Sequence, residues 1–333
     1  MTKTLAQAAR IGRRTMLLTL SAALMIASLP GGAQAAWPDK PVKIILPFGA
    51  GGVADVSSRL VAEKLSEKLG QRVFIENMPG PGGINAARAV VSAVPDGYTL
   101  GLVTNGTAIS VAAFKTLPFD PLTQFEMISG LGQFNLLFAV PANSPYKTLE
   151  DFIKAAKAQP GKLNIGTIVV GSTQHLGAEM FKSLAEANVV IVTFKNSPDA
   201  VVSLLRNDVQ MVIEFPPAIQ GQINDGRLRV LASSGPARET AMPAVPTVAE
   251  AGVKGYEVTS WNGVFAPKGV PKEVLEKMNK AMREVLAMPE IKERFNKLGM
   301  DPHSSSPEEL MSRLVADIKK WNAVIDKAGI PRK

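Results

Sequence analysis

The chain has 333 residues, 46% of them hydrophobic, and a formal net charge of +8 at pH 7. It has no cysteine, which excludes a disulfide framework and a thiolate metal site. Four of its basic residues lie within the first fourteen, the remainder carries a net charge of about +4, and only three Trp and three Tyr are available for stacking on bases, so we expect no nucleic-acid partner.

The first 35 residues have the pattern of a secretory signal peptide. MTKTLAQAARIGRR is basic without an acidic residue, TMLLTLSAALMIASL is apolar, and Ala33-Gln34-Ala35 forms an A-x-A cleavage site. The apolar run is shorter than the roughly 20 residues that span a bilayer, which argues against an anchor. We therefore expect cleavage after Ala35 and export from the cytoplasm, with the pair Arg13-Arg14 leaving both the general and the twin-arginine route open.

Short apolar runs alternate with segments of helical periodicity through most of the chain. We predict strands at 42–46, 72–75, 98–104, 135–140, 163–167, 189–194, 209–214, 228–233 and 263–266. This alternation favours α/β layers with helices on both faces of mainly parallel sheets. About nine strands favour two sheets over one. The chain is expected to pass from one sheet to the other near LLFAVP and to return before WNGVFAP. A chain that crosses twice has a cleft between its halves, where ligands bind.

Capping residues mark several of the predicted helices. Residues 53–69 carry apolar side chains at helical spacing and end at Gly70. SPD at 197–199 predicts a helix that begins with Ser197 as its N-cap, and SPEE at 306–309 is a capping box. We interpret these residues as structural.

The loop FGAGGVAD, residues 48–55, admits two interpretations. Gly49, Gly51 and Ala54 fit the relaxed dinucleotide fingerprint G-x-G-x-x-A, and Glu76 follows near the expected distance. Export argues against a dinucleotide, and a second glycine loop, NMPGPGGINAARA, competes for the space of the ribose. We therefore expect no cofactor here.

Catalytic chemistry has little support in the sequence. The chain has two His and no G-x-S-x-G motif. Ser172 stands three residues before His175, but a Ser in a loop that enters a helix more often caps backbone N–H groups. Two His without Cys do not favour a catalytic zinc site. We expect no metal and no enzymatic activity.

The sequence also repeats one local pattern, a loop of small or hydroxyl residues before a predicted helix. Gly-rich or Ser/Thr-rich loops precede predicted helices at FGAGG, TNGT and GSTQ, and KNS stands before another. Such loops expose backbone N–H groups at the positive ends of helix dipoles, so they bind anions without Arg or Lys. Each alone is also an ordinary capped turn, whereas convergence of four on one cleft would indicate a binding site.

Four stretches after the leader carry a family resemblance: WPDKPVKIILPFGAGGVADVSSRLVAEKL, GSTQHLGAEMF, VPTVAEAGVKGYEV and WNGVFAPKGVPKEVLEKMN. They resemble the Bug-type solute receptors of tripartite tricarboxylate transporters, over essentially the whole chain beyond the leader. The resemblance implies a periplasmic two-domain α/β binding protein of the Venus flytrap kind, type II-like. It implies a signal peptide at 1–35, a discontinuous domain I at 36–137 and 258–333, and a domain II at 138–257.

The resemblance also implies a function. Such a receptor captures a small organic carboxylate, with dicarboxylates among the candidates, and delivers it to the membrane components of the transporter. We expect it to act as a monomer. A ligand sensor of the same fold that docks on a signalling protein is the alternative, and an exported enzyme is a third. Carried onto this chain, the resemblance gives as ligand-binding residues Phe48, Gly49, Ala50, Gly51, Gly52, Asp55, Asn105, Thr107, Gly171, Ser172, Thr173, Asn196, Glu214 and Phe215.

Two places depart from the family pattern and bear on the ligand. Asn196 stands where relatives commonly have Gly, and residues 215–217 are Phe-Pro-Pro after Glu214. A carboxylate inside an anion site repels the ligand unless it is protonated or paired, so we predict that Glu214 contacts a hydroxyl, an amine or water. Asp55 either caps its helix or accepts a hydrogen bond from the ligand.

Overall fold

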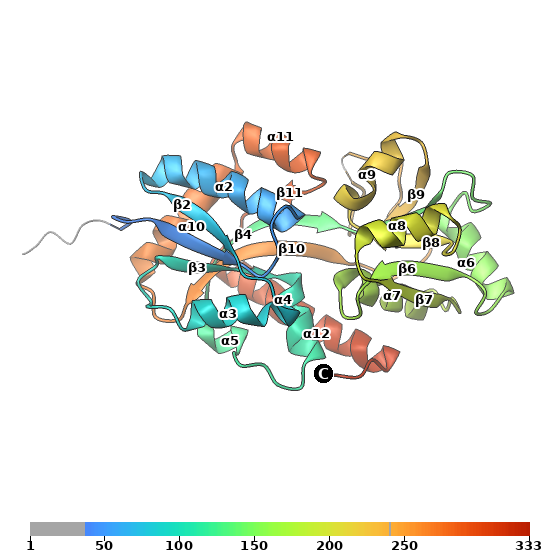
Figure 1. Cartoon of the computed structure of the whole chain (residues 1–333), viewed down its shortest axis with the longest axis horizontal. Helices are drawn as coiled ribbons and strands as arrows, with labels where there is room; N and C mark the ends of the chain where they lie inside the picture. Colours follow the sequence, from blue (N-terminus) through green and yellow to red (C-terminus); the bar gives the residue numbers. More distant parts are fainter. Residues whose placement is uncertain (1–36, 240) are drawn as a thin grey trace, which may run out of the picture. The chain divides into compact units, whose positions relative to one another are not determined.

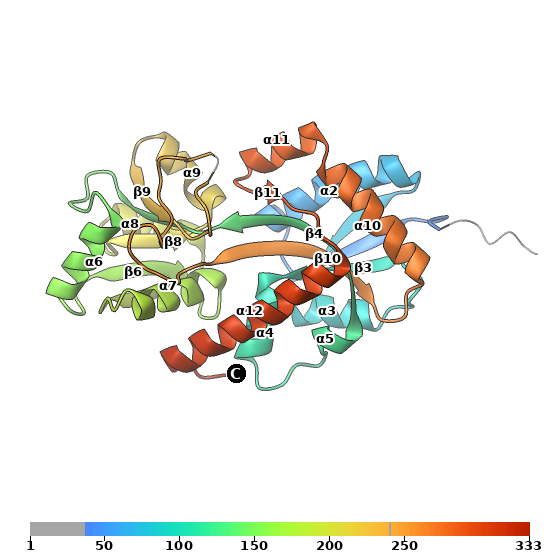
Figure 2. The same ribbon diagram turned by 180° about the vertical axis from the view of Figure 1, so that it is seen from behind.

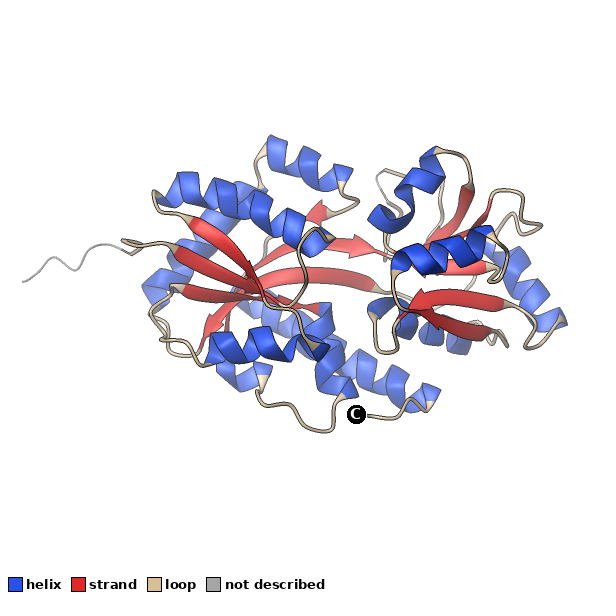
Figure 3. Ribbon diagram, viewed as in Figure 1, coloured by secondary structure: helices blue, strands red, loops and turns tan. Residues whose placement is uncertain are grey.

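Two β-sheets flanked by helices organise the chain from Lys40 onward (Figure 1, Figure 3). The computed structural model describes residues 37–239 and 241–333. The expected signal peptide, 1–35, and its cleavage site lie outside these residues. Over the described ranges, none of the helices combines the length and the apolar character that crossing a membrane requires.

The first sheet has six strands in the order β11-β4-β10-β3-β1-β2. Its strands are β1 (Val42–Leu46), β2 (Val73–Asn77), β3 (Thr99–Thr104), β4 (Phe125–Asn135), β10 (Thr259–Pro267) and β11 (Asp301–Pro302). The helices of the same part of the chain are α2 (Val53–Leu69), η1 (Pro81–Gly83), α3 (Ile84–Val91), α4 (Asn105–Ala113), α5 (Pro121–Gln124), α10 (Lys272–Leu286), α11 (Pro289–Lys297) and α12 (Pro307–Ala328). β1 is parallel to β2 and β3, whereas β10 is antiparallel to β3 and β4.

The second sheet has five strands in the order β7-β6-β8-β5-β9. They are β5 (Leu137–Pro141), β6 (Asn164–Ile168), β7 (Val190–Phe194), β8 (Met211–Glu214) and β9 (Leu228–Ser233). The helices between them are α6 (Leu149–Ala158), α7 (Thr173–Leu184), α8 (Ser197–Leu205) and α9 (Pro216–Asn224). β6 is parallel to β7 and β8, whereas β5 is antiparallel to β8 and β9.

The α/β class is confirmed, but both sheets are mixed, so the expectation of mainly parallel sheets is wrong. The strand pairs of β1-α2-β2 and β6-α7-β7 are parallel because a helical crossover returns the chain to the same end of the sheet. β5 follows β4 directly, and β10 returns after a connection whose described residues, 234–239 and 241–258, form no regular helix. These two strands run against their neighbours, and a buried apolar run does not reveal its direction.

Most predicted strands are confirmed, and those at 42–46 and 228–233 have the bounds expected. Most of β4 lies outside the predicted strands, because SGLG in its middle interrupts the apolar pattern. Close packing accounts for these glycines: a Cβ at Gly132 would lie 2.9 Å from Cε1 of Phe295. β10 is also longer than the predicted segment 263–266.

Helix ends follow local chemistry. α2 ends at Gly70, whose φ of 70° is left-handed. The capping box before α12 is confirmed, since Ser306 Oγ accepts from Glu309 N at 3.1 Å and Glu309 Oε2 accepts from Ser306 N at 2.8 Å. The N-cap of α8 is Asn196, not Ser197 as predicted, because the amide oxygen of Asn196 accepts from Asp199 N at 2.9 Å.

The pair β4 and β10 links the two sheets. β10 pairs with β4 from Pro267 opposite Phe125 to Thr259 opposite Asn135, and β4 leads into β5 through a single residue. Behind this pair, α12 contacts both α4 and α7 (Figure 2). All strands of the second sheet except the first residue of β5 fall within 138–257. The division into domains at 137/138 and 257/258 stays a prediction.

Candidate functional site

A cavity of about 450 Å³ lies among loops that follow strands of both sheets. This volume is within the usual range for small-molecule sites. Its polar and loop residues are Pro47, Phe48, Gly80, Pro81, Gly82, Gly83, Thr104, Gly106, Thr107, Ser110 and 169–172. The remaining residues are Ala87, Leu102, Ile109, Ala113, Phe114, Phe119, Phe125, Phe265, Ile330, Pro331 and Lys333. Among the described residues that line it, Lys333 is the only charged one.

The start of α4 forms part of the cavity lining. Thr104 is extended and precedes the helix. Its N–H donates to Thr107 Oγ1 at 3.2 Å and its side chain accepts from Thr107 N, which forms a capping box and leaves the N–H groups of Asn105 and Gly106 outside it. The first N–H groups of a helix have no intrahelical acceptor, and they carry a positive partial charge. Because Gly106 and Thr107 line the cavity, this end of α4 is suited to an anion.

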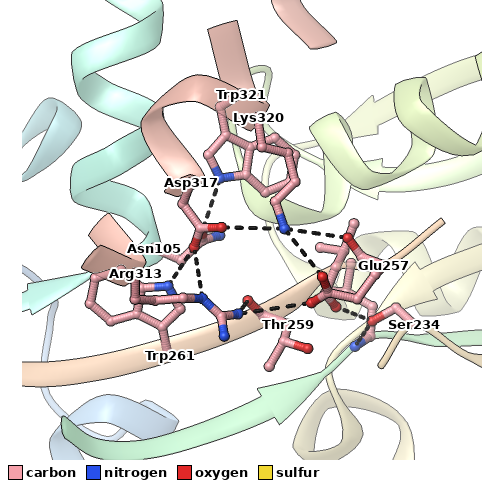
Figure 4. Close-up of polar contacts among 11 residues, drawn as sticks. Asn105, Ser234, Glu257, Thr259, Trp261, Arg313, Asp317, Lys320 and Trp321 are labelled. Carbon is pink, nitrogen blue, oxygen red and sulfur yellow. Dashed lines mark hydrogen bonds and ion pairs between the residues drawn. The ribbon is translucent and has the colours of Figure 1, made fainter. Parts of the chain in front are cut away.

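Asn105, the first residue of α4, is committed to contacts within the protein. Its side chain is buried, and its Nδ2 donates to Thr173 Oγ1 at 3.0 Å. Its Oδ1 accepts from Trp321 Nε1 at 2.8 Å; both of these residues are drawn in Figure 4. These bonds join α4 to α7 and to α12. Asn105 and Thr173 do not line the cavity, so their predicted contact with a ligand stays a prediction.

The loop 48–55 was predicted to bind the ligand. Of its residues, only Phe48 lines the cavity. Asp55 instead fixes the loop: its carboxylate accepts from Gly51 N and Asn77 Nδ2, both at 2.9 Å, and from Arg59 Nε at 3.0 Å. Burial alone would raise the pKa of Asp55, but the bonds from Arg59, Gly51 and Asn77 outweigh it and lower that pKa. The carboxylate is thus held at the start of α2.

The loop before α7 faces the cavity from the second sheet. Gly171 has a φ of 86°, and both Gly171 and Ser172 line the cavity. Ser172 Oγ accepts from His175 N at 3.1 Å, so the contact between these two residues is a helix cap. Gly171 N approaches His175 Nδ1 at 3.5 Å.

Glu214, the last residue of β8, is fully buried. Its Oε1 accepts from Ser197 Oγ at 2.7 Å, and its Oε2 accepts from Phe215 N at 2.8 Å and Gln174 Nε2 at 3.3 Å. Burial raises the pKa of Glu214, against the opposing effect of these three bonds. The donors belong to the starts of α7, α8 and α9, so the carboxylate lies where three helix N-termini meet. The hydroxyl group that contacts Glu214 is that of Ser197, a residue of the protein and not of a ligand.

The other two predicted residues also have structural contacts. Asn196 caps α8, and the ring of Phe215 meets Phe134 edge-on with centroids 4.8 Å apart. The cavity therefore brings together Phe48, Thr107, Gly171 and Ser172 from the predicted set. Its lining does not include Gly49, Ala50, Gly51, Gly52, Asp55, Asn105, Thr173, Asn196, Glu214 or Phe215.

Sequence reasoning missed two parts of the cavity. The second glycine loop, 80–83, was interpreted only as an obstacle to a ribose, although its glycines mark a close approach of the backbone. Phe114, Phe119, Phe125 and Phe265 come from separate segments, and no local pattern connects them. Within residues 37–239 and 241–333, no three His, Cys, Asp or Glu side chains are grouped to hold a metal ion.

Comparison with known proteins gives one consistent family. The family model described as "Tripartite tricarboxylate transporter family receptor" matches residues 57–330. Protein BugT of Bordetella pertussis is 31% identical over 299 residues, which cover 89% of this chain and 92% of that protein. A solved Rhodopseudomonas palustris protein with adipate is 32% identical, with a TM-score of 0.78 over 89% of this chain and 99% of that one. MatC of Rhodopseudomonas palustris, with bound malate, is 28% identical, with a TM-score of 0.73 over 87% of this chain and 100% of that one.

Proposed function

Because the chain belongs to the Bug-type receptors of tripartite tricarboxylate transporters, a family of periplasmic solute-binding proteins and not of enzymes, we propose that it captures a small organic carboxylate and delivers it to the membrane components of such a transporter. One observation carries this proposal. The cavity is lined by the start of α4 on the first sheet and by Gly171 and Ser172 on the second. A solute held there contacts both parts of the chain.

The binding step involves no covalent chemistry. The carboxylate of the solute exchanges water for N–H donors at the start of α4, and each charge-assisted bond is roughly twice as strong as a neutral one. Since both sheets contribute to the cavity, a bound solute favours the arrangement in which they are close. The transporter then recognises this solute-bound arrangement. Adipate and malate in the two Rhodopseudomonas palustris proteins support a carboxylate as the solute.

A thermal-shift screen tests the binding step. Mono-, di- and tricarboxylates are each compared with the corresponding uncharged amide. A ligand present at about 100 times its Kd stabilises the fold by ~2.7 kcal/mol, whereas the amide controls leave the melting temperature unchanged. No response to any carboxylate would contradict the proposal.

Deletion of the gene followed by an uptake assay tests the delivery step. Loss of uptake of a solute that the screen has identified supports delivery to a transporter. Normal uptake favours instead the alternative of a sensor with the same fold, whose partner is a signalling protein.

A further inference from the structure

The side of the cavity away from the loops is apolar. Phe125 stacks on Phe119 with ring centroids 5.7 Å apart, and on Phe265 with centroids 3.7 Å apart. Leu102 and Ile109 line the same cavity. A carboxylate placed against these side chains would lose its hydration without gaining a donor, which is unfavourable. This surface therefore accepts the apolar part of a solute.

The cavity also extends along one face of α4. Its residues on this helix begin at Gly106, continue through Ile109 and Ser110 to Ala113, and Phe114 follows the helix. Positions three and four apart share a helix face. At 1.5 Å per residue, Gly106 and Phe114 are about 12 Å apart along the axis, which is long enough to accommodate an extended chain of eight carbons.

Helix starts of the second sheet already have acceptors from the protein: Ser172 Oγ accepts from His175 N, Asn196 Oδ1 accepts from Asp199 N, and Glu214 Oε2 accepts from Phe215 N. α7, α8 and α9 begin around Glu214, whose oxygens accept bonds from all three. Glu214 is fully buried and does not line the cavity. A solute carboxylate is left with the donors at the start of α4 and in the loop before α7.

We propose that the solute is a monocarboxylate with an extended apolar body. Its carboxylate lies near Gly106 and Thr107, and its chain or ring lies along α4 toward Phe114. This inference rests on the proposed function and specifies the ligand of the same site. Lys333 is the one charged residue among the described residues of the lining, and its backbone bonds to Ala113 and Lys115 place it beyond the end of α4. A second carboxylate would have to reach Lys333.

Titration calorimetry with solutes of matched length tests the inference. We expect octanoate to bind about tenfold or more tightly than suberate, which has the same number of carbons and a second carboxylate, and we expect citrate not to bind. Tighter binding of suberate would show that Lys333 receives a second carboxylate. That result overturns this inference and leaves a carboxylate receptor intact, whereas absence of binding by every carboxylate overturns both proposals.

Chain length gives a second, independent readout. Phe114 is half-buried and directly follows α4, so Phe114→Ala shortens the apolar surface at the end that only a long chain reaches. We expect octanoate affinity to fall about tenfold, while butyrate affinity stays the same and Phe114→Leu behaves like the parent protein. Equal losses for octanoate and butyrate would place the chain elsewhere and overturn the inference. Folding of each variant is checked by its melting temperature without ligand.

Discussion

Trp261 on β10 and Asp317 on α12 are joined by a hydrogen bond of 2.6 Å from the indole Nε1 to the carboxylate Oδ2 (Figure 4). Only 3% of the Asp317 side chain is exposed, and Arg313 and Lys320 of the same helix contact its carboxylate at 3.3 and 3.2 Å. Lys320 also reaches the backbone oxygen of Glu257 at 3.4 Å. One carboxylate thus fixes α12 to the segment through which the chain returns from the second sheet.

Replacing this carboxylate is expected to cost much of the stability of the protein. Asp317→Ala leaves a buried indole N–H and two cations without their acceptor, so we expect a loss of about 2–4 kcal/mol in the free energy of unfolding. Glu276→Gln is the control, because Glu276 pairs with Lys272 on an exposed helix face and such pairs contribute less than about 1 kcal/mol. Urea unfolding measures both, and similar values for the two variants would contradict the prediction.

The bond between Asn105 and Thr173 joins helices that flank different sheets. Thr173→Val removes the acceptor and leaves the Asn105 amide buried without this partner. We expect the affinity for the solute to fall about 3- to 10-fold, since the arrangement that binds it loses one hydrogen bond. Thr173→Ser retains the hydroxyl and serves as the control in the same calorimetric titration. If valine and serine variants bind equally, the bond has no part in solute capture.

Glu214 predicts a pH dependence of stability with a defined sign. Burial raises its pKa above the ordinary value of 4.5, so the folded protein retains this proton when the unfolded chain has lost it. The resulting stabilisation is complete below about pH 4.5 and is lost as the pH rises through the folded-state pKa. Glu214→Gln has no such proton.

The measurement is the difference in the free energy of unfolding between Glu214→Gln and the parent protein, taken at several pH values between about 4 and 8. We expect the variant to gain stability relative to the parent as the pH rises. Using the difference cancels the titration of groups that the two proteins share. A difference that stays constant over this range would mean that burial does not disfavour the charged form of Glu214.

Gly101 and Gly221 allow a matched pair of alanine substitutions, because Gly101 is closely surrounded and Gly221 is not. A methyl group at Gly101 would overlap the Phe265 ring and come within 2.8 Å of Val90 Cγ2, so Gly101→Ala is expected to destabilise the fold by about 1–3 kcal/mol. Gly221 lies in α9 with open space around it, and Gly221→Ala is expected to stabilise by about 0.5–1 kcal/mol. Thermal unfolding checks both signs. Equal effects would show that Phe265 moves aside freely.

The elements that sequence reasoning found depend on short-range chemistry. The strand at 42–46 is a continuous apolar run, and the helix ends at Gly70 and at 306–309 follow from capping within four residues. The direction of β5 and β10 depends on which strand lies beside them, and a run of apolar residues contains no information about this neighbour. The fold class could therefore be predicted, but not the mixed order of the sheets.

The candidate site could likewise be predicted only where it depends on short-range chemistry. Gly171 and Ser172 were found because a loop that precedes a helix needs particular residues, and both line the cavity. The sequence around Glu214 does not indicate that its oxygens accept bonds from Ser197 and Gln174, because these residues lie 17 and 40 positions away. The aromatic side of the cavity likewise forms only when β4, β10 and the segment after α4 are brought together.

The burial of Glu214 also has a consequence for competing anions. A carboxylate attached to the chain is present at a fixed effective concentration, because its placement costs no translational freedom once the protein has folded. Free acetate, phosphate or sulfate in the surrounding medium therefore competes poorly for the helix starts of the second sheet. The acceptor that Phe215 N, Ser197 Oγ and Gln174 Nε2 share is therefore a group of the protein itself.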